Sequence, residues 1–232
     1  MHLGQVNILR KQLSKLKEII SQKYRREVLS NLLSSEIYQL AKNNKKKTVT
    51  ILDYGSGYNP ILINQIIKKI LIKSKKIKIK VYCFDDYSKD QLKKLNNSSK
   101  FSFRNIADLS KIKKKGFHIT LIIDVIHHVG LEKVDKIKKI FLKLKKMSNF
   151  LIIKDHFEYG FLSNLLLIGM DFFSNYGDGT NIPKKYFTIS SFEKFCEINK
   201  LTEIKRINDK KYYKWYWPIV NNEKLQFISV LK

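Results

Sequence analysis

Short segments rich in β-branched and aromatic residues alternate with helical patterns, and this alternation limits the fold more than any other feature. The segments with strand character cover residues 48–55, 77–86, 101–106, 119–128 and 149–156. Each is short and apolar and ends near turn-forming or charged residues, as buried strands do. Strands separated by helices predict a parallel sheet with right-handed crossovers. The sequence therefore predicts an α/β fold with a doubly wound sheet.

Helical patterns separate these strands. They cover residues 61–73, a short segment at 91–97, and residues 133–146. Pro60 stands just before the first pattern, and proline is favoured at a helix start.

The end of the chain has a different order. A helix is predicted over residues 190–200, followed by two strands, 201–207 and 225–232, with an aromatic loop between them. Strands joined by so short a connection pair antiparallel. We expect seven strands in one mostly parallel sheet, with an antiparallel C-terminal strand.

Two segments fall outside the alternation. Residues 3–43 carry apolar side chains at helical spacing, which predicts one broken helix or two consecutive helices. We divide the chain into an N-terminal helical extension, residues 1–47, and a main domain, residues 48–232. Residues 157–188 form an insertion rich in aromatic residues and glycine, which we interpret as a lid; the alternative is an extra helix packed on the core.

The formal net charge of +26 suggests an anionic partner such as RNA or a membrane. However, only five of the 46 basic residues are arginine, the side chain that binds phosphate through two parallel hydrogen bonds. A genome rich in A/T codons would produce the same excess of lysine. Compositional bias and an anionic partner both stay open, with the basic side of the N-terminal helices as the candidate contact to an anionic membrane.

Neither a secretory signal nor a membrane span is visible. The longest apolar run near the middle, residues 165–170, is far shorter than the roughly 20 residues that a span needs. Cys83 and Cys196 lie far apart and match no metal-ligand spacing. We expect a cytoplasmic protein, at most peripheral to a membrane, and no metal site.

Residues that could bind a ligand or take part in catalysis follow the predicted strands. This is the edge at which open parallel sheets bind ligands. They are Asp53, Gly55 and Gly57 after the first strand, Asp85 and Asp86 after the second, Asp108 after the third, Asp124, His127 and His128 after the fourth, and Asp155 and His156 after the fifth. Each alone has an ordinary explanation: a turn, a helix cap or a polar residue at a strand exit. Their joint placement favours one shared site. Because a full G-x-G-x-x-G is missing, a nucleoside without a pyrophosphate fits better than a dinucleotide.

Three motifs resemble those of class I S-adenosylmethionine-dependent methyltransferases. ILDYGSGYNP, residues 51–60, is similar to the family's first motif, a strand, an acidic residue and G-x-G-x-G, with Asn59 in place of the third glycine. NIADLS, residues 105–110, resembles the loop whose aspartate faces the adenine. DVIHHV, residues 124–129, resembles the fourth-strand motif of the small-molecule branch. The resemblance covers roughly residues 48–155 and implies a Rossmann-like sheet with S-adenosylmethionine as the cofactor.

The resemblance also implies roles for the residues after the first two strands. Gly55 and Gly57 would lie against the methionine part of the cofactor, and Asp53 would orient its amino group. Asp85, or its neighbour Asp86, would bind the ribose hydroxyls.

Two further groups would complete the cofactor site. Asp108, with Ile106 and Ala107, would flank the adenine, and Asp124 with Val125 would line the methionine end.

Methyl transfer from a sulfonium is an in-line displacement, so the protein must mainly align the reactants and exclude water. A base helps when the acceptor is a hydroxyl or a protonated amine, and histidine has a suitable pKa. We expect His128 or His156 to be this base, with Asp155 orienting an imidazole. The alternative is that His127 and His128 only shape the pocket.

The sequence therefore predicts an S-adenosylmethionine-dependent methyltransferase that modifies an oxygen or nitrogen atom of a small-molecule or lipid-like acceptor. An RNA or protein methyltransferase that uses the basic surface, and a non-catalytic protein of the same fold, are the alternatives. Few arginines and the lack of an Asn/Asp-Pro-Pro-Tyr-type motif make nucleic acid the less favoured partner. The acceptor and the oligomeric state are not determined by the sequence.

Overall fold

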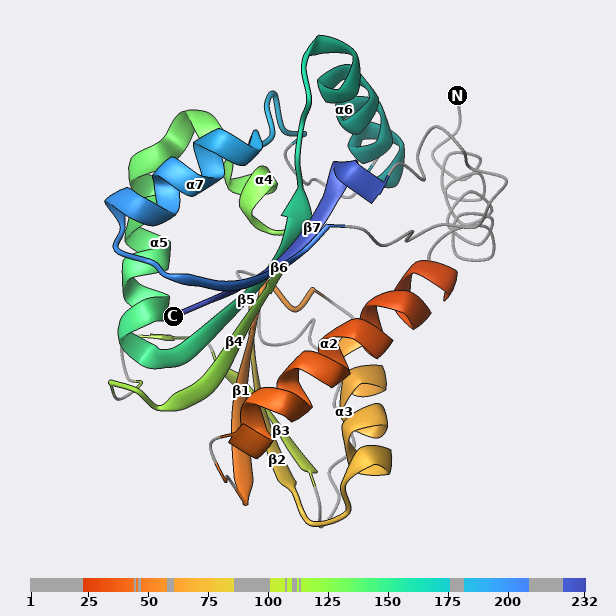
Figure 1. Ribbon diagram of the computed structural model, residues 1–232, viewed down its shortest axis with the longest axis vertical. Coiled ribbons are helices and arrows are strands. Elements are labelled where there is room, and N and C mark those ends of the chain that lie inside the picture. Colours follow the sequence, from red (N-terminus) through yellow and green to blue (C-terminus); the bar gives the residue numbers. More distant parts are fainter. Residues whose placement is uncertain are drawn as a thin grey trace, which may run out of the picture.

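A computed structural model describes residues 23–43, 45, 47–57, 61–85, 101–106, 108–109, 112, 114–175, 182–208 and 223–232. Within this part, seven strands form one sheet in the order β3-β2-β1-β4-β5-β7-β6 (Figure 1). The strands are β1 (Thr48–Tyr54), β2 (Lys78–Phe84), β3 (Phe101–Ile106), β4 (Phe117–Ile123), β5 (Ser148–His156), β6 (Glu203–Ile207) and β7 (Gln226–Leu231).

The helices lie between the strands in chain order. They are α2 (Lys23–Asn43), α3 (Ile61–Lys73), α4 (Ile126–Val129), α5 (Val134–Met147), α6 (Phe161–Asn175) and α7 (Ile189–Ile198), with short 3₁₀ turns at η4 (Leu131–Lys133) and η5 (Glu223–Leu225).

The strands pair as the alternation predicts. β1 to β5 are joined by parallel ladders, whereas β7 runs antiparallel to both β5 and β6. The expectation of a mostly parallel α/β sheet with an antiparallel C-terminal strand is confirmed. Strand order reverses between β1 and β4, so the loops after these two strands leave the sheet side by side.

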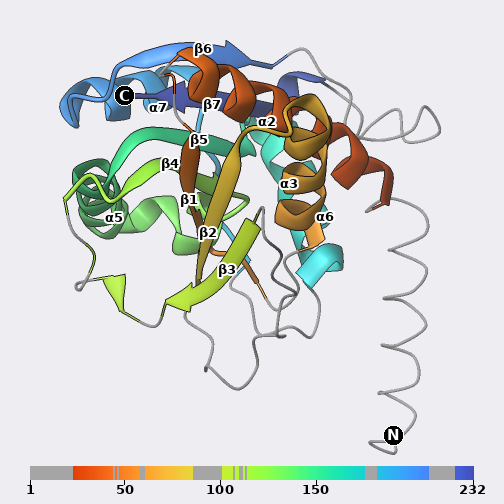
Figure 2. The same cartoon turned by 90° about the horizontal axis from the view of Figure 1, so that it is seen from below.

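The two faces of the sheet are covered by different helices. Side chains alternate between the faces along each strand: in β5, Ile152 packs with the cluster of α2 and α3, while Leu151 and Ile153 pack with the cluster of α5 and α7. Figures 1 and 2 show α2 and α3 together on one face and α4, α5 and α7 on the other. α6 stands beyond the carboxyl ends of the strands (Figure 1).

Helix α2 is part of this core. Leu29, Leu33 and Ile37 recur every four residues on one side of the helix and are almost completely buried against α3 and the sheet. The boundary that we drew at residue 47 therefore does not separate two independent hydrophobic cores.

The fourth strand is shorter than predicted. We expected a strand over residues 119–128, but β4 ends at Ile123 and residues 126–129 form the helical turn α4. Asp124 takes the left-handed conformation, with φ of 54°, and this breaks the extended chain. The turn carries both histidines of the DVIHHV motif.

Several predictions concern residues outside the described ranges: the helix start at Pro60, the helix at 91–97, and the N-terminal helix before residue 23. Among the residues that are described, no helix has both the length and the apolar character needed to cross a bilayer.

Replacing Leu33 by alanine should lower the free energy of unfolding by about 2–5 kcal/mol, because it leaves a cavity between α2, α3 and the sheet. Ile72→Ala is the matched control, since Ile72 is 81% exposed on α3 and its truncation should change stability by less than about 0.5 kcal/mol. Urea denaturation of both variants gives the comparison. Equal, small losses would show that α2 is not part of the folding unit.

Candidate active site at the carboxyl ends of the strands

The loop after β1 is held in a fixed position against the second strand. The Gly55 N–H donates to the carbonyl of Phe84 at 2.8 Å, and the Gly57 N–H donates to Oδ2 of Asp85 at 2.6 Å. Gly55 has a φ of 78°, and a Cβ there would lie 2.3 Å from Cγ2 of Val125. Only glycine fits this approach between the loops after β1 and β4.

Asp53 lies under this loop. Its side chain is buried, and burial raises the pKa of Asp53 to about 7, with a smaller contribution from the nearby carboxylate of Asp85. The two carboxylates thus meet at the ends of β1 and β2, where the sequence predicted a ligand.

Asp124 is the centre of an ion network. Nζ of the fully buried Lys154 lies 2.5 Å from its Oδ1, and the Arg25 guanidinium, from the first turn of α2, pairs with its Oδ2. Burial by itself would raise the pKa of Asp124, but the two cations hold it well below its ordinary value. Burial and the nearby Arg25 charge lower the pKa of Lys154 to about 8.

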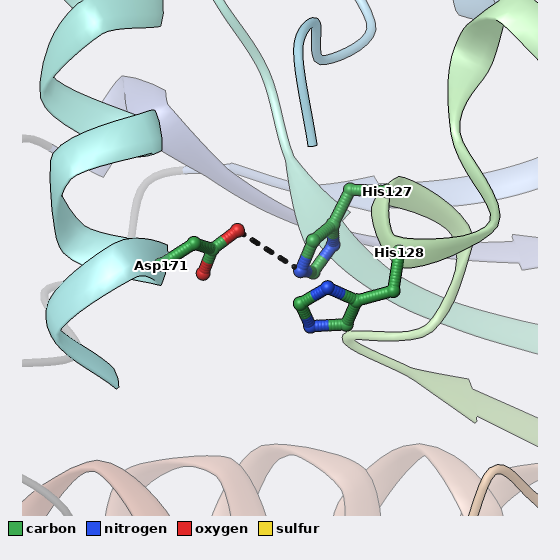
Figure 3. Close-up of side chains that lie close together, drawn as sticks. All are labelled: His127, His128 and Asp171. Atoms are coloured by element: carbon green, nitrogen blue, oxygen red, sulfur yellow. Dashed lines mark ion pairs between the residues drawn. The ribbon is translucent and has the colours of Figure 1, made fainter. Parts of the chain in front are cut away.

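His127 lies between two carboxylates. Its Nδ1 is 2.5 Å from Oδ1 of Asp155, and its Nε2 is 3.3 Å from Oδ2 of Asp171, which comes from α6. Burial alone would lower the pKa of His127, but Asp155 and then Asp171 raise it above its ordinary value. The hydroxyl of Tyr186 donates to Oδ2 of Asp171. Figure 3 shows the Asp171 carboxylate facing the imidazoles of His127 and His128, whose ring centres are 4.1 Å apart.

His156 lies next to this cluster but differs in its surroundings. Its ring centre is 5.2 Å from that of His127, and its backbone N–H donates to Oδ1 of Asp155 at 2.8 Å. Burial and the Lys154 charge lower the pKa of His156 to about 4, so its imidazole is neutral at pH 7. The imidazole that Asp155 contacts at 2.5 Å is therefore that of His127, while Nδ1 of His156 lies farther from the same oxygen, at 3.6 Å.

Most of the predicted residues come together at this edge of the sheet. The glycine loop (residues 55–57), Asp53 and Asp85 lie at the ends of β1 and β2. The histidines, Asp124 and Asp155 lie at the ends of β4 and β5. Asp108 follows β3 and is exposed. Asp86 and Ala107 are outside the described residues.

Three residues of the site were not predicted: Arg25, Lys154 and Asp171. Tyr186 belongs to the aromatic residues of the insertion at 157–188, which we expected to cover the acceptor. Two of the three had a signal in the sequence. Lys154 directly precedes Asp155 in an otherwise apolar strand, and Asp171 is the only charged residue in the helix at 161–175. Nothing in the sequence near Arg25 distinguishes it from the other basic residues of the N-terminal segment.

Sequence comparisons identify no relative: no protein-family model matches the chain, and no curated protein matches it. Solved structures do resemble its fold. An S-adenosylmethionine-dependent methyltransferase from Archaeoglobus fulgidus has a TM-score of 0.56 at 13% identity, covering 94% of this chain and 97% of that one.

Longer enzymes match over part of their length. The human N-acetylserotonin methyltransferase in complex with S-adenosylmethionine has a TM-score of 0.52 at 9% identity over 89% of this chain, and methyltransferase CalO6 has 0.50 at 9% identity over 79%. This chain spans 54% of the former protein and 57% of the latter. Together with the strand order and the glycine loop, these likenesses show that the chain has the fold of class I S-adenosylmethionine-dependent methyltransferases.

Proposed function

We propose that this protein is an S-adenosylmethionine-dependent methyltransferase that acts on an oxygen or nitrogen atom of a small-molecule or lipid-like acceptor. One observation carries the proposal: a glycine loop with two carboxylates and a buried histidine–carboxylate cluster lie at the same edge of a sheet with the methyltransferase fold. The first group suits a nucleoside cofactor, and the second suits an acceptor that must lose a proton.

The described residues fit the cofactor. The close approach of Gly55 to Val125 leaves no room for a side chain, while a Cβ at Gly57 would have open space around it. Asp53 would hold the amino group of the methionine part, and Asp85, or Asp86, would bind the ribose hydroxyls. Asp108 and Ala107 would flank the adenine. When bound, S-adenosylmethionine supplies a methyl group on a positively charged sulfur.

Asp124 has a supporting part in this scheme. Its carboxylate is already engaged by Arg25 and Lys154, so it would fix the loop that carries Val125 to the methionine end. The same network connects α2 to the site, and it therefore couples the N-terminal helix to the geometry of the cofactor loop.

The acceptor would lie against His127, His128 and Asp171. Asp155 fixes the ring of His127 through Nδ1, which leaves the buried Nε2 directed toward Asp171. α6, which carries Asp171, would cover the acceptor and exclude water. Its outward side chains are apolar, with Phe161, Leu162 and Leu165 all more than half exposed. Contact with an anionic membrane stays a prediction.

A similar fold occurs in the human N-acetylserotonin methyltransferase, whose name gives a small molecule as its acceptor. This likeness also supports a small-molecule acceptor here. No feature of the described residues favours an RNA or protein substrate over it.

Calorimetric titration tests the cofactor. S-adenosylmethionine and S-adenosylhomocysteine should bind, whereas ATP and NAD should not. Asp85→Asn should weaken binding about 10–100-fold, because the ribose loses charge-assisted hydrogen bonds. Asp135→Asn, on the exposed first turn of α5, is the matched control and should bind normally. Absence of binding to the unmodified protein would refute the proposed function, and normal binding by Asp85→Asn would move the ribose contact to Asp86.

The pH dependence of binding tests Asp53. Because its pKa is raised to about 7, the carboxyl is neutral below that pH and cannot pair with an ammonium group. Affinity for S-adenosylhomocysteine should therefore fall up to about tenfold for each pH unit below 7, because the protonated carboxyl no longer attracts the ammonium group. In Asp53→Asn the low-pH loss should disappear. A loss that persists in this variant would assign it to another group.

A further inference from the structure

We propose that His127, His128 and Asp171 form a binding site for one divalent transition-metal cation, with Zn²⁺ as the first probe, and that this cation binds the acceptor. The proposal rests on the proposed function, since it names how the acceptor end of that site works. A nitrogen from each histidine and an oxygen of Asp171 all lie within 4.8 Å of one another (Figure 3).

The distance between two of these ligand atoms matches a shared ion. Nε2 of His127 and Oδ2 of Asp171 are 3.3 Å apart. Two atoms that each lie about 2.0–2.2 Å from a tetrahedral metal are about 3.3–3.5 Å apart. Although it is this close to the carboxylate, Nε2 makes no hydrogen bond within the described residues, and the side chain is only 3% exposed. Buried nitrogens without a hydrogen bond are rare, and a cation between the two atoms would satisfy this one.

The surroundings of these ligands also match a metal site. Histidine ligands commonly donate their second ring N–H to a carboxylate, which fixes the tautomer. Nδ1 of His127 has this contact with Asp155 at 2.5 Å. The second ligand residue, Asp171, is also held by a neighbour, because the Tyr186 hydroxyl donates a hydrogen bond to its carboxylate. Two imidazoles and one carboxylate leave a fourth position, as in catalytic zinc sites.

The carboxylates of Asp155 and Asp171, on either side of His127, attract a cation to this place. Arg25 and Lys154 carry one positive charge more than Asp124, so these five side chains together have a formal charge of −1 when the imidazoles are neutral. The neighbouring group of His127, Asp155 and His156 suits a cation less well, because its nitrogen–oxygen distance of 2.5 Å is too short for two ligands of one ion.

The cation would lower the pKa of an acceptor hydroxyl that occupies the fourth position. The hydroxyl proton leaves to solvent. The oxygen then forms a bond to the methyl carbon, and the carbon–sulfur bond breaks with its electron pair remaining on sulfur, which becomes neutral. No oxidant or reductant is needed, so a cation without redox chemistry suffices.

Metal analysis of untagged protein tests the site. After chelation and titration with Zn²⁺, the protein should hold one equivalent, and Co²⁺ in its place should give the visible absorption of a four-coordinate site. His128→Ala and Asp171→Asn replace partly exposed ligands, so the variants should fold, as circular dichroism can verify, but lose the bound metal. Asp155→Asn should weaken binding about 10–100-fold. His118→Gln, which alters a histidine outside the cluster, should bind normally.

Calorimetry with S-adenosylhomocysteine separates this proposal from the proposed function. The loop after β1 should bind this compound equally well with and without the chelator. Less than a tenth of an equivalent of Zn²⁺, or unchanged binding by folded His128→Ala and Asp171→Asn, would overturn the metal site even if the cofactor binds. Bound metal without cofactor binding would refute the proposed function instead.

Discussion

The side chain of Asp124 is 22% exposed, and two cations on different elements compensate its charge. Lys154 reaches it from β5 and Arg25 from α2, so the end of β4 is fixed to both neighbours. Without Asp124, the fully buried ammonium group of Lys154 would lose this ion-pair partner, and an unpaired buried charge costs about 3–5 kcal/mol. The same carboxylate connects α2, through Arg25, to the left-handed turn at the end of β4.

Because side chains alternate along β5, its two neighbouring charged residues contact different groups on opposite faces of the sheet. Lys154 points to the face of α2 and α3, where it meets Asp124, and Asp155 points to the other face, where it meets His127. Consecutive residues of one strand thus serve a structural ion network and the oriented imidazole. Both lie at the carboxyl edge of the sheet, next to the loop that holds Gly55 against Val125.

Helix α6 completes the site from outside the sheet. Its apolar side is incompletely covered within the described residues, yet Asp171 is directed inward to His127 and Tyr186. Asp171 connects α6 to the buried imidazole, and the interpretation of residues 157–188 as a lid stays a prediction.

The sequence by itself determined the order of the strands and of α3, α5 and α7, the antiparallel end of the sheet, and the residues that stand at the strand ends. It could do so because periodicity and turn residues are local properties. It predicted Asp155 as an orienting group but could not choose the imidazole, because that choice depends on the turn at Asp124 and the short helix that follows it. Arg25 and Asp171 lie 99 and 44 residues from the side chains they meet, Asp124 and His127, and no local pattern connects such pairs. Only the tertiary structure decided that Arg25, on α2, and Asp171, on α6, reach the same edge of the sheet. Their positions depend on how both helices pack on the assembled sheet.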